Sequence, residues 1–130
     1  MQDKVEYWLN LCDSDLDVAK YMLKGNYYLY AGFMCHQVVE KALKAMVADK
    51  TDVIPPKIHD LRKLARLSDV FDTLLEEHIT LINKVSPLQI EARYPEYKEK
   101  IAETLSKEYC KELIEETEAF LCWIKQKLEK

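Results

Sequence analysis

YYLYAGFMCHQVVEKALKAMVADK, residues 27–50, predicts one long helix that is apolar around most of its circumference. At about 100° per residue, apolar side chains cover well over half of the helix surface, namely Ala31, Met34, Cys35, Val38, Val39, Ala42, Leu43, Ala45, Met46 and Val47. A surface helix needs only one apolar stripe. We therefore expect this segment to be either the central helix of a bundle or one half of a subunit interface.

A narrow polar strip interrupts this apolar surface. It consists of Gln37, Glu40, Lys41 and Lys44. Polar groups in such a surround either bind a polar ligand or partner, or only fix the register of the packed helices. The sequence is compatible with both interpretations.

Periodic apolar side chains predict further helices at about 3–23, 58–67, 70–85 and 101–128, with Ser68 and Asp69 capping the helix that begins at 70. Pro55 and Pro56 exclude helix from the connection before residue 58. With 2 Gly and 4 Pro in 130 residues, the chain has too few turn residues for many short strands. We predict a single all-α domain over 1–130, an antiparallel up-and-down helical bundle with four main helices plus a short extra helix.

The charge of the chain argues against a protein that holds nucleic acid mainly by neutralising phosphates, because its net charge is −4. Residues 41–66 are locally basic, however, with seven basic and three acidic side chains. This segment is either a solvated face or the neighbourhood of a small anion site. No segment approaches the ~20 apolar residues of a membrane-spanning helix, so we expect no membrane association.

The cysteines indicate neither a metal site nor a disulfide framework. They are Cys12, Cys35, Cys110 and Cys122, with no CxxC pair and no metal-ligand spacing to a histidine. All but Cys110 fall on apolar faces of predicted helices, where a free thiol behaves as a small hydrophobe. We expect reduced thiols, a cytoplasmic location and no cofactor.

Each histidine has a structural alternative to a functional role. His59 opens the predicted helix after the prolines, where it can cap that helix, pair with Asp60 or titrate in a site. His36 lies at the edge of the apolar arc and is expected to be a satisfied core or interface residue. His78 lies among Glu76, Glu77 and Thr80 and is expected to be exposed.

Arg93, Tyr94 and Pro95 form a short motif in the least regular part of the chain. An arginine there can grip a phosphate or carboxylate with two hydrogen bonds. The alternative is that Arg93 pairs with a glutamate of a neighbouring helix and that Tyr94 covers the end of the bundle.

Three segments together are similar to the HEPN family, small helical domains often encoded beside nucleotidyltransferases in bacteria and archaea. In order, they are AGFMCHQVVEKALKAM at 31–46, HDL at 59–61 and ARYP at 92–95, and the likeness extends over about 5–128. The resemblance implies a helical bundle that forms a homodimer through its long helices. It also implies nucleotide binding and partnership with a small nucleotidyltransferase that supplies the catalytic machinery.

The resemblance also marks positions of this chain. They are Gln37, Glu40, Lys41 and Lys44, then His59 and Asp60, and finally Arg93, Tyr94 and Pro95. His36 stands where the family often has Gln. We expect nucleotide or anion binding by Lys41, Lys44, His59, Arg93 and Tyr94, supported by Gln37, Glu40 and Asp60.

One departure from the family argues against catalysis. Members that cleave RNA carry an Arg followed by a His after roughly four to six residues, and here Lys98, Glu99 and Lys100 follow Arg93 instead. No His occurs after His78, and proton transfer during RNA cleavage needs a group that titrates near neutrality. We therefore expect a non-catalytic binding module in a toxin–antitoxin-like pair. The alternatives are a diverged ribonuclease toxin that uses His59 with Arg93, and a purely structural homodimerisation module.

Overall fold

The computed structural model describes residues 3–51, 54–89 and 95–129, and in these ranges all regular structure is helical. Its α-helices are α1 (Asp3–Lys24), α2 (Tyr28–Lys50), α3 (Leu61–Leu67), α4 (Glu76–Val85), α5 (Pro95–Glu103) and α6 (Lys107–Glu129). Two short 3₁₀ helices are η1 (Phe71–Thr73) and η2 (Ser86–Leu88). The all-α prediction is confirmed, but six α-helices replace the expected four plus one.

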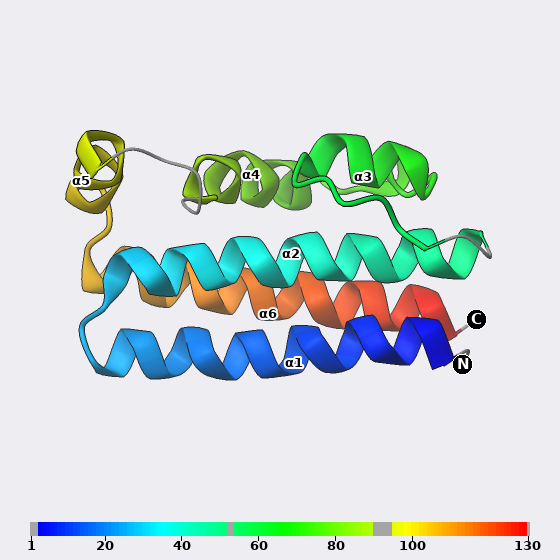
Figure 1. The fold of residues 1–130 in the computed structure, drawn as a ribbon, viewed down its shortest axis with the longest axis horizontal. Coiled ribbons are helices and arrows are strands. Elements are labelled where there is room, and N and C mark those ends of the chain that lie inside the picture. The colour runs from blue at the N-terminus through cyan, green and yellow to red at the C-terminus, as the bar shows by residue number, and fades with distance from the viewer. Residues whose placement is uncertain (1–2, 52–53, 90–94, 130) are drawn as a thin grey trace.

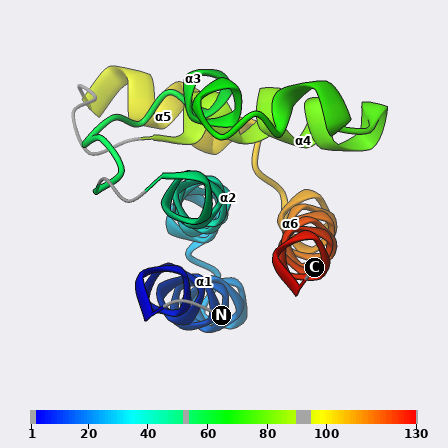
Figure 2. The same ribbon diagram turned by 90° about the vertical axis from the view of Figure 1, so that its right-hand side faces the viewer.

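The three long helices α1, α2 and α6 lie side by side, and α3, α4 and α5 form a second layer across α2 (Figures 1 and 2). α1 runs opposite to α2, whereas α6 runs in the same direction as α2 (Figure 1). The second layer returns the chain to the end at which α2 begins. Because the second layer lies between α2 and α6 in the chain, these two long helices run in the same direction.

α2 is the central helix, because α1, α3, α4 and α6 all contact it. Its apolar arc is almost fully buried, and the inner stripes of α1 and α6 close over it. α1 contributes Val5, Leu9, Cys12, Leu16 and Ala19, and α6 contributes residues that include Leu113, Phe120, Leu121 and Ile124. Of the two alternatives for this helix, the central one is confirmed within a single chain.

α1 ends at the predicted turn, where Asn26 adopts a left-handed backbone conformation with φ of 66°. The Tyr27 N–H donates to the Met22 carbonyl at 2.8 Å, and the Asn26 N–H donates to the Leu23 carbonyl at 3.0 Å. These two bonds satisfy carbonyls at the end of α1 and turn the chain sharply. The turn sends α2 back along α1.

The prediction that Ser68 and Asp69 cap the next helix is wrong. Both residues belong to the end of α3, where the Ser68 hydroxyl donates to the Ala65 carbonyl at 2.9 Å. Asp69 has a φ of 60°, and the Val70 N–H donates to the Ala65 carbonyl at 3.1 Å. This is the same type of helix termination as at Asn26, and the next α-helix begins only at Glu76.

The last predicted helix is divided in two. Ile101 is buried in α5, and the chain turns before α6 begins at Lys107. The Ser106 hydroxyl accepts a hydrogen bond from the Tyr109 N–H at 3.1 Å, which satisfies one of the free amides at the start of α6. Among the described residues, no helix is long and apolar enough to cross a membrane.

The four cysteines are free thiols, and their burial differs in part from the prediction. Cys12 and Cys35 are buried in the core as expected, and Cys110 is also buried. Cys122 is exposed, because it lies on the outer side of α6 between the buried Leu121 and the half-buried Trp123.

Candidate functional site

Glu40 of α2 is a carboxylate with almost no access to solvent, since only 3% of its surface is exposed. The connection between α2 and α3 places His59 against it, with His59 Nδ1 2.8 Å from Glu40 Oε1. Because a carboxylate only accepts hydrogen bonds, Nδ1 carries the proton. The His59 side chain is 54% exposed, so the rest of the ring, including Nε2, is available to a ligand.

The second carboxylate oxygen of Glu40 is also paired. Lys44, one turn further along α2 and itself buried, donates from Nζ to Glu40 Oε2 at 3.0 Å. The same ammonium group lies 5.6 Å from the centre of the Trp8 ring on α1, a distance at which a cation is attracted to an aromatic face. The two charges of this buried pair therefore compensate each other.

His36, one turn before Glu40, completes the group. Its Nδ1 lies 3.7 Å from Glu40 Oε1 and 3.4 Å from Gln37 Oε1. Burial lowers the pKa of His36 below its ordinary value, although the Glu40 carboxylate and hydrogen bonds to Gln37 and to the His59 backbone act in the opposite direction. We refer to His36, Glu40, Lys44 and His59 as the Glu40 cluster.

The structure brings together only part of the predicted site. Lys44 and His59 meet at Glu40, and Gln37 contacts His36 at its margin. Lys41 instead faces α1, where its Nζ donates to Asp15 Oδ2 at 2.5 Å.

Asp60 does not join the cluster. The Asp60 carboxylate caps α3 by accepting a hydrogen bond from the Lys63 N–H at 3.1 Å. Arg93 and Tyr94 lie outside the described residues. His36 is the cluster member that sequence reasoning assigned only to packing, and its signal was the four-residue spacing from Glu40.

The cluster can hold an imidazole in a fixed orientation at the protein surface. Glu40 fixes the ring of His59 through Nδ1, and Lys44 holds the other oxygen of that carboxylate in place. An imidazole held in this way presents Nε2 to a phosphate, carboxylate or hydroxyl of a ligand. The same arrangement is also found where a histidine transfers protons.

Comparison with known families assigns the fold. The sequence model of the HEPN domain matches residues 5–128. The chain belongs to the HEPN family. The resemblance inferred from the three sequence segments is thereby confirmed, and the match includes the whole Glu40 cluster.

A solved structure supports the same fold. The crystal structure of an archaeal HEPN homologue superimposes with a TM-score of 0.69 at 20% sequence identity, over 98% of this chain and 99% of that chain. At this identity, the likeness concerns the arrangement of the helices. No curated protein matches the sequence.

Proposed function

We propose that this HEPN chain is a non-catalytic module that binds a nucleotide or another small anion at the exposed edge of the Glu40 cluster. In this proposal it acts as a homodimer and docks on a nucleotidyltransferase, in a toxin–antitoxin-like pair. One observation carries the binding site, namely the hydrogen bond by which the buried Glu40 fixes the half-exposed ring of His59.

The surroundings of His59 support an anion rather than a cation as the ligand. Lys57 and Lys63 are exposed and lie close to His59 along the chain. Lys44 has a different role from the one its charge suggests, because Glu40 neutralises it inside the protein. We therefore assign ligand contact to His59, with Arg93 and Tyr94 as further contributors, and orientation to Glu40 and Lys44.

A second apolar stripe on α1 supports self-association. Besides its buried stripe, α1 carries an outer stripe with heptad spacing, formed by Tyr7, Leu11, Ser14, Val18 and Tyr21. Tyr7, Val18 and Tyr21 are exposed apolar side chains on one face of a helix of 22 residues. Helices with such spacing pack along each other, so this stripe is the proposed homodimer face.

A thermal-shift screen tests nucleotide binding. A nucleotide at ~10 times its Kd stabilises a protein by about 1.4 kcal/mol, which for a domain of this size raises Tm by roughly 2–6 °C. We expect a nucleotide-specific shift that is lost in His59→Ala and Arg93→Ala. It should persist in Lys111→Ala, which removes an exposed charge of α6 far along the chain from the site. A flat response to all nucleotides, phosphate and pyrophosphate would contradict the binding proposal.

The contact between Glu40 and His59 also favours a second candidate function, a diverged ribonuclease. A histidine oriented by a carboxylate is a common form of general base. Expression toxicity and RNA cleavage that disappear in His59→Ala but persist in Lys111→Ala would support it. Stable RNA in the presence of the purified protein would exclude it.

A further inference from the structure

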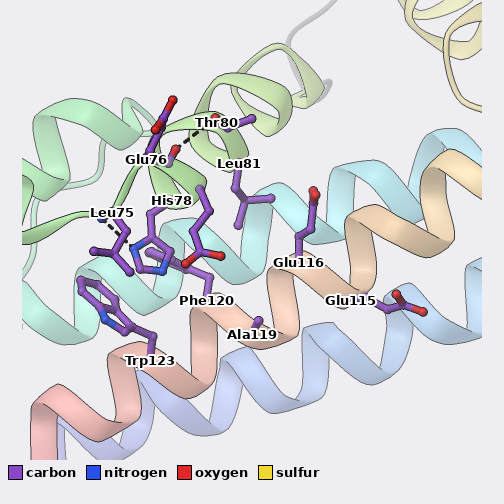
Figure 3. A pocket seen from close by; sticks show the side chains of 11 residues that line it. Leu75, Glu76, His78, Thr80, Leu81, Glu115, Glu116, Ala119, Phe120 and Trp123 are labelled. Carbon is purple, nitrogen blue, oxygen red and sulfur yellow. Dashed lines mark hydrogen bonds between the residues drawn. The ribbon is translucent and has the colours of Figure 1, made fainter.

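A groove of about 760 Å³ lies between α4 and α6 and shares no residue with the Glu40 cluster. Its floor is apolar and aromatic, formed by Leu81, Phe120 and Trp123, with Leu75 at one side (Figure 3). The His78 ring centre lies 4.2 Å from that of Trp123 and 5.4 Å from that of Phe120. Leu75 is 50% exposed although it adjoins these rings. The groove therefore offers apolar surface to a partner.

His78 places a fixed hydrogen-bond donor in this groove. Only 6% of the residue is exposed, which corrects the prediction that it is on the surface. Its Nδ1 accepts a hydrogen bond from the Leu75 N–H at 3.1 Å, so in the neutral ring the proton is on Nε2. Among the described residues, no acceptor is hydrogen-bonded to Nε2. Nε2 is not one of the buried polar atoms that lack a partner, and because His78 lines the groove, a group bound there can accept a hydrogen bond from it.

Carboxylates surround the apolar floor. They are Glu76 and Glu77 of α4 and Glu115 and Glu116 of α6. Of these four carboxylates, only Glu116 has an ion pair within the described part of the chain, to Lys84 at 3.1 Å. Lys127 lies 4.6 Å from the centre of the Trp123 ring and is a further cation near this surface. The rim is therefore acidic overall and repels the phosphates of a nucleotide or nucleic acid.

We propose that the groove between α4 and α6 docks a basic amphipathic segment of a protein partner. Apolar side chains of that segment pack between Leu75 and Trp123, and its Lys or Arg side chains pair with Glu76, Glu77 and Glu115. A polar acceptor of the segment takes the hydrogen bond from His78 Nε2. The inference rests on the docking part of the proposed function and is independent of the nucleotide site.

The test uses a synthetic amphipathic helical peptide of leucine and lysine, with a leucine–glutamate peptide of the same pattern as its counterpart. In ¹H–¹⁵N spectra of the full chain, the lysine peptide should shift the Trp123 indole signal and amides of α4 and α6. The double variant Glu76→Lys/Glu115→Lys should weaken its binding by at least ~10-fold. The control Glu99→Lys/Glu103→Lys changes the net charge equally on the exposed side of α5 and should bind as wild type does.

A second variant removes the apolar contribution without entering the core. Leu75→Ser truncates the half-exposed side chain and should also weaken binding of the peptide. The proposal would be overturned if Glu99→Lys/Glu103→Lys weakened binding of the lysine peptide as much as the groove variants do. It would also be overturned if the glutamate peptide bound as tightly as the lysine peptide, or if the NMR shifts were confined to helices other than α4 and α6. If the chain forms a dimer and Leu75→Ser dissociates it, the groove binds a second copy of the chain, and the proposal of a basic partner segment is wrong.

The same samples separate this inference from the proposed nucleotide site. The groove variants should keep any thermal shift caused by nucleotides, because they lie outside the Glu40 cluster. His59→Ala should keep binding of the lysine peptide. Loss of one response without the other therefore identifies which proposal has failed.

Discussion

His59 Nδ1 lies 2.8 Å from Glu40 Oε1, and this contact joins a surface imidazole to a carboxylate that is enclosed by the protein. The carboxylate is held on its other side by Lys44 at 3.0 Å. An imidazole at the surface is thus positioned by a charge pair in the interior. The stability of the fold and the geometry of the candidate site consequently depend on the same residues.

Glu40→Gln should destabilise the chain by about 3–5 kcal/mol, because it leaves the buried Lys44 ammonium without a compensating charge. Unfolding in urea, followed by circular dichroism, measures the difference. The matched control is Glu118→Gln, whose ion pair with Lys20 is half exposed and should contribute at most about 1 kcal/mol. Similar losses in both variants would show that Glu40 does not act through a buried charge pair.

The free energy of unfolding should decrease when the pH falls below 6.5, the ordinary pKa of a histidine side chain. Burial lowers the pKa of His36 and of His78 in the folded state, so the unfolded chain binds protons more readily in this range. The stabilisation is complete above 6.5 and is lost as the pH falls toward the lowered values. Urea midpoints between about pH 8 and pH 5.5 measure the slope.

His36→Gln should reduce this slope and leave the part that is due to His78. Glutamine keeps hydrogen-bonding groups at the position but cannot take up a proton in this range. An NMR titration of the wild-type His36 ring should give a midpoint below 6.5. An unchanged slope in the variant would contradict the role assigned to His36.

Much of the fold was predictable because its core is periodic. The apolar arc of α2 indicated a helix that needs neighbours on most sides, and α2 is central in the structure. The same periodicity placed Glu40 and Lys44 on one strip. It could not place His59 against them, because that contact depends on the path of the connection after α2 and not on helical spacing.

The wrong predictions also have physical reasons. Ser68 and Asp69 carry the composition of a helix start, but a left-handed φ at Asp69 makes them a helix end, and composition alone does not separate the two. His78 was judged by its acidic neighbours in sequence. On α4 it shares a face with the buried Leu81, Ile82 and Val85, three, four and seven residues later, and that spacing was the signal for its burial.

Asp69→Gly should stabilise the chain by roughly 0.5–1 kcal/mol, because glycine adopts the left-handed conformation with φ of 60° without the steric cost of a side chain. The change also removes an exposed ion pair with Lys50, which contributes little. Thermal unfolding measures the gain. Asp72→Gly, at an exposed residue of η1, is the control and should not stabilise. A loss of stability in Asp69→Gly would contradict this account of the turn.

Cys122 should be the thiol that reacts rapidly with Ellman's reagent at about pH 8. Burial raises the pKa of Cys12 and of Cys35 to about 12 and that of Cys110 to about 11, so these thiols hold almost no thiolate and are also enclosed. Cys122→Ser should remove the rapid phase, and unfolding should release the other three thiols. Rapid reaction of the folded Cys122→Ser variant would contradict the burial of the remaining cysteines.

Val18→Lys should weaken self-association by at least ~10-fold, because it places a charge in the middle of the outer apolar stripe of α1. Light scattering over a range of concentrations gives the mass, which for a dimer is twice 15.3 kDa. Gln126→Lys adds the same charge at an exposed position of α6, on a different helix from that stripe, and should remain dimeric. Both variants should keep the helical circular dichroism spectrum, because neither side chain belongs to the buried core. A wild-type chain that stays monomeric at ~100 μM, or equal dissociation of the two variants, would contradict a dimer through this face of α1.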